Sequence, residues 1–466
     1  MATSPAAKRC RSENGPTGVP EMGVLFPRIL LPDQSKVDLE KWAVVACDQY
    51  TSEEDYWDRV EAFVGDSPST LRLTFPEVYL EKGRDDEIIS NINATMKGYV
   101  SEGIFKETET EGVMLVERTL RSGVLRRGIV LALDLEQYSF KPGSGSLIRA
   151  TEKTIEARIP PRLQVRKDAP VELPHIIVLV DDEDDALIST LIDFCSSETS
   201  VYETDLMEHA GHLKGFWIDQ PEALNRLCDA IKKLGDAKVF SHKYGVNHPL
   251  LVFAMGDGNH SLATAKSLWE EVKAEAIERG DELEAVMETH PGRYALVEIQ
   301  NCQDPTLVFE PINRLVFNVD PESIFSDLKL FFNDAQVEIA EGEDVYNEVL
   351  TGSDNHVIGY MMNSRRGTIR LGNPNKILPV ASMTDFLDDW LAKHPEARID
   401  YVHETTAIDR HCTLSDPRNI GFVFSSMNKS DLFRTVVKDG VLPRKTFSMG
   451  NAHDKRFYFE ARRIRP

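Results

Sequence analysis

The stretch Leu250-Leu-Val-Phe-Ala-Met-Gly-Asp-Gly-Asn-His-Ser-Leu-Ala-Thr-Ala-Lys266 passes from an apolar run through a glycine turn into a helical pattern. Gly256 and Gly258 carry no side chain, so the backbone can turn sharply or approach a ligand closely there. The first N–H groups of the predicted helix lack intrahelical acceptors and form the positive end of the helix dipole. A phosphate group therefore fits this strand-to-helix turn.

Four polar side chains follow or separate these glycines, namely Asp257, Asn259, His260 and Ser261. Side chains of these types bind metal ions, position phosphate or transfer a proton. A purely structural turn, in which Asn259 or Ser261 caps the helix, is the alternative. Because so many functional groups gather at one helix start, we interpret the turn as a ligand site.

Composition narrows the class of protein. The chain has 466 residues, of which 41% are hydrophobic, enough for two lobes with ordinary cores. No apolar run approaches the ~20 residues that cross a bilayer, so we expect a cytoplasmic protein without a membrane partner. The net charge of −23 disfavours nucleic acid but permits a small anionic substrate at a local cationic cluster. The six cysteines form no C-x-x-C pair, so no zinc cage is indicated.

Short apolar runs alternate with amphipathic stretches along the chain, which predicts an α/β or α+β fold with mixed sheets, flanking helices and two lobes. We predict a disordered tail at 1–22, a main region at 23–317 that holds the glycine turn, and a C-terminal region at 318–466. The predicted strands are centred on 113–116, 128–133, 176–180, 251–253, 295–297 and 421–424. The predicted helices are 53–64, 85–100, 221–234 and 261–279.

Two further segments concentrate polar groups. An apolar run from Trp42 is interpreted as a strand that ends at Asp48, where α/β proteins place functional residues; capping of the next helix is the alternative. Arg149, Glu152 and Thr154 lie in a segment that could grip phosphate while it keeps one acid for chemistry. A solvated helix with ion pairs is the alternative there.

A pair of histidines and a basic loop complete the candidates. His209 and His212 have helical spacing, but no third ligand follows at a zinc spacing, so metal ligation is not favoured. In the C-terminal region, a loop projects Arg444, Lys445 and Ser448, which suit an anion. Basic residues that complement the end of the preceding helix are the alternative.

These segments together resemble the domain-of-unknown-function family numbered 1015, from about Val24 to the C-terminus. The resemblance rests on Asp257-Gly-Asn-His-Ser261, on Arg149-Ala-Thr-Glu152 with Thr154, and on Lys445-Thr446. The turn is also similar to the phosphate-binding helix start of ParB nucleotide-binding domains, sulfiredoxin and free-serine kinases. Asn259 and Ser261 stand where the commoner pattern has His and Arg, so we expect a cation to arrive from elsewhere, with Arg444 and Lys445 folding back onto the turn.

We predict a phosphoryl-transfer enzyme, kinase or phosphatase, that acts on a small hydroxylated metabolite, with a serine-like compound as one candidate, and with Mg²⁺ and ATP or ADP at Gly256–Ser261. A non-catalytic nucleotide-binding regulatory protein is the alternative, and the oligomeric state is left open. Asp257 is the expected Mg²⁺ ligand or general base, and His260 the proton shuttle or phosphate donor. Asp48 or Glu152 is the other candidate base. The expected clamps and phosphate contacts are Arg149, Thr154, Arg444, Lys445, Ser448, Asn259 and Ser261.

Overall fold

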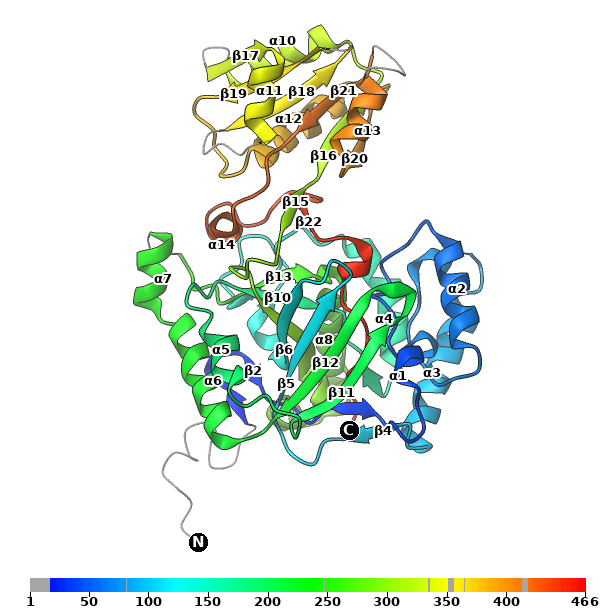
Figure 1. Ribbon diagram of the computed structural model, residues 1–466. Helices are drawn as coiled ribbons and strands as arrows, with labels where there is room; N and C mark the ends of the chain where they lie inside the picture. The colour runs from blue at the N-terminus through cyan, green and yellow to red at the C-terminus, as the bar shows by residue number, and fades with distance from the viewer. Residues whose placement is uncertain are drawn as a thin grey trace. The chain divides into compact units, whose positions relative to one another are not determined.

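The computed structural model in Figure 1 describes residues 17–466 except 81, 246–247, 334–335, 351–355, 364 and 413–417. The chain forms two compact units. Unit 1 runs to Leu307 and takes up the last segment, Asn451–Pro466, whereas unit 2 is Val308–Gly450. This division differs from a single boundary after Phe317, because the chain returns to unit 1 at its end. Of the predicted tail, residues 1–16 lie outside the described part, and residues 17–22 form β1 (Gly18–Val19) and η2 (Pro20–Met22).

Unit 1 is built around an 11-stranded mixed sheet, which confirms the predicted α/β class with mixed sheets. The strand order is β11 (Ser200–Leu206), β12 (Gly211–Ile218), β5 (Val113–Leu120), β6 (Leu125–Asp134), β14 (Tyr294–Asn301), β10 (Ile177–Val180), β13 (Phe253–Asp257), β8 (Ile148–Arg149) and β7 (Tyr138–Ser139), with β2 (Val24–Leu25) joining β1 to β6. Pairs are antiparallel from β11 to β14, whereas β14–β10, β13–β8 and β8–β7 are parallel. Short pairs are β3 (Leu30–Pro32) with β4 (Phe105–Glu107) and β9 (Val171–Glu172) with β23 (Arg462–Arg463).

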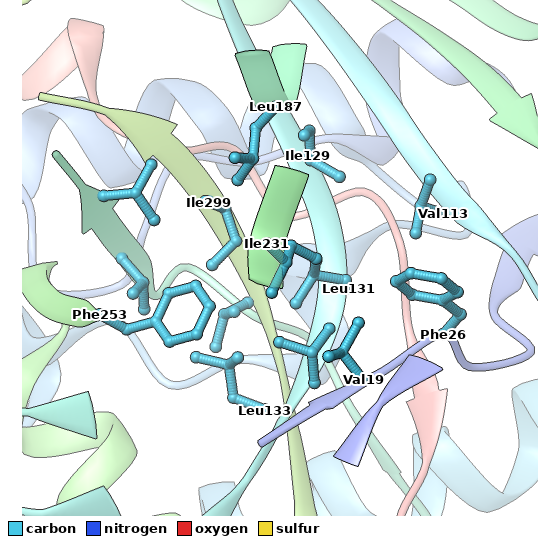
Figure 2. Packing of buried hydrophobic residues seen from close by; sticks show 14 of the residues in the cluster. Val19, Phe26, Val113, Ile129, Leu131, Leu133, Leu187, Ile231, Phe253 and Ile299 are labelled. Atoms are coloured by element: carbon cyan, nitrogen blue, oxygen red, sulfur yellow. The ribbon is translucent and has the colours of Figure 1, made fainter. Parts of the chain in front are cut away.

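Successive strand residues point to opposite faces of the sheet, and both faces are buried. In β5, Val113 and Leu115 join one apolar cluster while Met114 and Val116 join the other. Figure 2 shows the first cluster, in which Ile231 packs among side chains of the sheet. Burying each such side chain contributes roughly 1.5–3 kcal/mol. Because both faces are buried, the apolar runs that form these strands are continuous and do not alternate with polar residues.

Helices cover the two faces. The first cluster is closed by α5 (Ala186–Ile192), α6 (Pro221–Leu234) and α8 (Asn259–Arg279). The second is closed by α1 (Leu39–Trp42), α2 (Glu54–Val64), α3 (Asp85–Ser101) and the C-terminal segment. The remaining helices of unit 1 are α4 (Ile159–Lys167), α7 (Ala237–Tyr244) and α9 (Leu283–Thr289).

The predicted strand from Trp42 is wrong, and two segments for which a helix was an alternative are not helical. The run from Trp42 is not a strand: Trp42 ends α1, and Val45 makes one isolated bridge to Phe457. Residues 149–158 are not a continuous helix, since Arg149 ends β8 and only η6 (Glu156–Arg158) follows before α4. His209 and His212 do not share a helix, because His212 lies in β12. In each case, pairing with residues far away in the sequence overrides the local preference for a strand or a helix.

Unit 2 contains a six-stranded antiparallel sheet in the order β17 (Val337–Glu341), β19 (Arg365–Leu371), β18 (Val357–Met362), β21 (Ile420–Val423), β16 (Asn313–Phe317) and β20 (Arg398–Val402). A separate pair joins β15 (Phe309–Pro311) to β22 (Phe447–Met449). Its helices are α10 (Pro321–Phe332), α11 (Glu343–Leu350), α12 (Pro379–Lys393), α13 (Thr405–Arg410) and α14 (Lys429–Lys438). Across the described residues of both units, no helix has the length and apolar character needed to span a bilayer.

Candidate functional site

The glycine turn links β13 to α8 through a single left-handed residue. Gly258 has φ 78° and ψ 28° and stands immediately before the helix. A Cβ at this position would lie 3.1 Å from the Cα of Ile176, at the edge of the neighbouring strand β10. Glycine is therefore required at 258 both by backbone conformation and by close packing. Gly256 lies inside β13 and is not at positive φ.

The first turn of α8 presents N–H donors that have no acceptor in the described part of the chain. Within the described residues, the N–H groups of Asn259, His260 and Ser261 have no acceptor, and the ladder begins with Leu262 N–H donating to Gly258 C=O. The side-chain oxygen Oδ1 of Asn259 is buried and also has no partner there. Buried polar atoms normally have a hydrogen-bond partner, so the buried Asn259 Oδ1 indicates a place for a ligand or an ordered water. We refer to this helix start and its surrounding side chains as the α8 site.

Asp257 and Lys455 bring opposite charges to the α8 site. Lys455 Nζ lies 3.2 Å from Asp257 Oδ2, and its side chain is 11% exposed. The other oxygen, Asp257 Oδ1, accepts the Gly258 N–H at 2.9 Å. Lys455 comes from the C-terminal segment, which is fixed to the sheet because Arg118 donates to the carbonyl groups of Asp454 and Lys455. The site therefore has a local ammonium group beside the helix N-terminus.

A chain of hydrogen bonds lies on the other side of Ser261. Ser261 Oγ is 3.0 Å from His175 Nε2, and His175 Nδ1 is 2.8 Å from Tyr458 Oη. Tyr458 Oη also accepts the Cys47 N–H at 3.2 Å. When His175 Nδ1–H donates to Tyr458, His175 Nε2 is left to accept the hydroxyl proton of Ser261.

Asp48 lies beside this chain, with Oδ2 4.0 Å from His175 Nε2. Burial raises the pKa of Asp48, but His175, the Gln49 amide and Lys455 together lower it further, so the net shift is downward. Asp48 is consequently an anion at neutral pH. It lies beside the His175 ring and contributes negative charge that interacts with the Lys455 ammonium.

His260 stands between these groups and the cations of the preceding segment. Its Nε2 accepts the Ile155 N–H at 3.3 Å, so the neutral ring carries its proton on Nδ1. Burial lowers the pKa of His260 to about 4, and Arg162 and Arg158 lower it as well, against an opposing effect of Asp48. At neutral pH His260 is thus an uncharged N–H donor.

We predict that a pH titration of the His260 imidazole by NMR gives a pKa of about 4 rather than the ordinary 6.5. Because the unfolded ring takes up its proton near 6.5 and the folded ring near 4, the stability that this ring contributes is complete above pH 6.5. This stability is lost as the pH falls from 6.5 to about 4. His260→Asn should remove this part of the pH dependence. A pKa near 6.5 in the folded protein would contradict the described environment.

Ser261, His175 and Tyr458 also line a cavity of about 150 Å³ in unit 1. Most of the other lining side chains are apolar and come from the segment after α2, from α3 and α4, and from the chain around β9. Arg162 and Glu77 form an ion pair in the wall. The cavity and the first turn of α8 therefore share one residue, Ser261.

The other residues predicted in unit 1 differ in their surroundings. Arg149 is buried, and its guanidinium donates to the carbonyl groups of Ser146, Pro249 and Leu250. These hydrogen bonds hold the chain that leads into β13. The guanidinium donors of Arg149 are therefore used by backbone carbonyl groups. Thr154 is buried, and its Oγ1 has no partner among the described residues. Glu152 is half-buried in the same connection between β8 and η6.

The basic loop belongs to unit 2. Arg444 and Lys445 are exposed, and Lys445 Nζ lies 4.8 Å from the centre of the Tyr401 ring. Ser448 Oγ donates to the Gly450 carbonyl. Whether this loop reaches the glycine turn stays a prediction. Among the described residues of unit 1, Lys455, Arg158 and Arg162 bring positive charge to the α8 site.

Sequence reasoning did not find His175, Lys455, Tyr458 and Arg162. The signal for His175 is its position directly before strand β10, and the Lys455 signal is a second basic pair near the C-terminus. His212, by contrast, contacts Asp205 and Glu203 at 2.8 and 3.2 Å. Among the residues that the structure describes, no group of three or more His, Cys, Asp or Glu is arranged to hold a metal.

The family described as "Protein of unknown function (DUF1015)" matches residues 29–390, so the chain belongs to this family. Its fold is similar to free serine kinase in complex with AMP, at 9% identity and a TM-score of 0.36, over 71% of this chain and 90% of that one. It is also similar to a conserved hypothetical protein from Pyrococcus furiosus (10% identity, TM-score 0.35, 72% and 95% covered). The chain is similar as well to SbnI with C-terminal truncation from Staphylococcus aureus (8% identity, TM-score 0.34, 69% and 82% covered). No curated protein matches.

Proposed function

We propose that unit 1 is a phosphoryl-transfer enzyme that acts on a small hydroxylated metabolite and binds nucleotide phosphates at the first turn of α8. The observation that carries the proposal is the set of N–H groups of Asn259, His260 and Ser261, which have no acceptor among the residues that the structure describes, beside the Lys455 ammonium. Backbone donors at a helix N-terminus and one lysine suit phosphate oxygens. A phosphatase would use the same groups with water as the acceptor.

Positioning and charge neutralisation do most of the work in phosphoryl transfer. Lys455 supplies positive charge at the α8 site, and the His260 Nδ1–H adds a neutral donor. Asp48 and His175, 4.0 Å apart, are the groups that fit proton removal from an acceptor hydroxyl.

Mg²⁺ usually binds proteins through one or two carboxylates together with substrate phosphates and water. Asp257 fits that role, because Oδ1 and Oδ2 each accept only one contact in the described structure. Mg²⁺ bound there would neutralise phosphate charge. Arg444, Lys445 and Ser448 are predicted phosphate contacts, and the nucleotide-binding experiment below applies to them as well.

The test is calorimetric titration of the full chain with ADP and with ATP plus Mg²⁺. We expect saturable binding, and Lys455→Met should weaken it by roughly 10- to 100-fold, because a hydrogen bond to a charged group contributes about 1.5–3 kcal/mol. Lys233→Met is the matched control, since Lys233 pairs with exposed Asp184. Turnover with a panel of hydroxylated metabolites should be lost in Asp257→Asn. If the wild type binds neither nucleotide, the proposed function is wrong.

A further inference from the structure

The cavity beside Ser261 has the size and lining of a pocket for an uncharged apolar group. A cavity of about 150 Å³ accommodates a ligand the size of benzene. Its walls include Leu73, Phe75, Met96 and Val165. A preformed apolar pocket with few polar groups is the usual form of a small-molecule site.

The charged groups of the wall already have partners. Arg162 pairs with Glu77, and Arg166 pairs with Glu172, which also binds Arg462. A zwitterion such as serine would have to separate these pairs to find a carboxylate and an ammonium partner, and separation of a buried pair is costly. The cavity therefore favours a neutral ligand.

The polar end of the cavity is the chain from Ser261 through His175 to Tyr458. Cys47 adds no competing nucleophile there, because burial raises the pKa of its thiol to about 12 and keeps it protonated. A ligand hydroxyl at this end can bond to Ser261 Oγ or to His175 Nε2. Ser261 also contributes to the phosphate side an N–H that has no acceptor in the described residues, so the hydroxyl would lie next to the phosphate.

We propose that this cavity binds the phosphoryl acceptor, and that the acceptor is a small uncharged alcohol with an apolar body, aromatic or branched aliphatic, rather than an amino acid. The assignment rests on the phosphoryl-transfer function proposed above. The acceptor oxygen forms a bond to the terminal phosphorus of a nucleoside triphosphate. The bond from that phosphorus to the nucleoside diphosphate breaks, and the hydroxyl proton passes to His175 Nε2.

The first experiment measures binding without nucleotide, by saturation-transfer NMR and calorimetry with benzyl alcohol, toluene and L-serine. We expect benzyl alcohol to bind saturably and serine not to bind. Ala169→Leu, which adds volume at the cavity wall, should abolish alcohol binding while nucleotide affinity is retained. Ala237→Leu, an exposed position on α7 outside the wall, is the matched control.

Two further variants keep the test decisive if Ala169→Leu does not fold. Leu73→Ala enlarges the cavity and should shift preference toward a bulkier alcohol such as 4-isopropylbenzyl alcohol. Ser261→Ala should reduce the preference for benzyl alcohol over toluene by roughly two- to tenfold. Serine binding without alcohol binding, or alcohol binding unchanged by both volume variants, would overturn the assignment. Alcohol binding that responds to these variants, with no nucleotide binding, would instead overturn only the phosphoryl-transfer function.

Discussion

Replacing Arg456 by methionine is expected to lower the free energy of unfolding of unit 1 by about 3–5 kcal/mol. Arg456 is 3% exposed, donates from Nε to the Pro174 carbonyl, and pairs with Glu298 and with Glu460. Burial raises the pKa of Glu298, yet Arg456 and Arg118 lower it further, so the carboxylate stays charged. Methionine would leave both carboxylates buried without the guanidinium that pairs with each of them.

The loss should extend to function, because residues adjacent to Arg456 form the α8 site. Lys455 and Tyr458 are held by the same segment, so nucleotide binding should weaken together with stability. Arg463→Met is the control, since Arg463 pairs with Glu107 at the surface, where such pairs contribute about 0–1 kcal/mol. Urea unfolding followed by tryptophan fluorescence measures the change. A loss below 1 kcal/mol, on the scale of such surface pairs, would show that the buried network does not hold the segment.

The second large effect is expected for Gly258→Val. Valine at φ 78° is strained, and its Cβ would lie 3.1 Å from the backbone of Ile176. Backbone strain and overpacking each cost about 1–3 kcal/mol, so the expected destabilisation is about 3 kcal/mol or more. The side chain would also crowd the approach to the first turn of α8, and phosphate binding should be lost.

Gly280 offers a matched control at the other end of the same helix. Gly280 has φ 77°, but a Cβ there meets nothing within 4 Å. Gly280→Val should therefore cost only the strain, about 1–3 kcal/mol, and leave nucleotide binding unchanged. Equal melting temperatures for the two variants, measured by calorimetry, would remove the packing argument. Equal nucleotide affinities would remove the argument that backbone at Gly258 approaches a ligand.

Much of the fold could be predicted because its signals are local. The apolar runs at β5, β6 and β14 are long and buried on both faces, and α6 and α8 have one apolar face between clear ends. The run from Trp42 is also apolar, but it begins at the last residue of α1 and continues as chain with one isolated bridge, because it packs against the C-terminal segment. No local pattern encodes that pairing.

The candidate site could be predicted only in part, for a related reason. Asp257, His260 and Ser261 share one turn, so the sequence alone brings them together. His175 arrives through the pairing of β10 with β13, and Lys455 through a C-terminal segment in which Lys455, Arg456, Glu460 and Arg462 are buried. Charges near a chain end are ordinarily interpreted as solvated. Arg149 is the opposite case: it lies in a polar segment that suggested a ligand site, but its guanidinium donates to backbone carbonyl groups.

The most direct test of the phosphate site is a crystal structure of the full chain with ADP and Mg²⁺. The account predicts phosphate oxygens within hydrogen-bond distance of the Asn259, His260 and Ser261 N–H groups and of Lys455 Nζ. Phosphates bound elsewhere, with these donors contacting only water or protein, would contradict it.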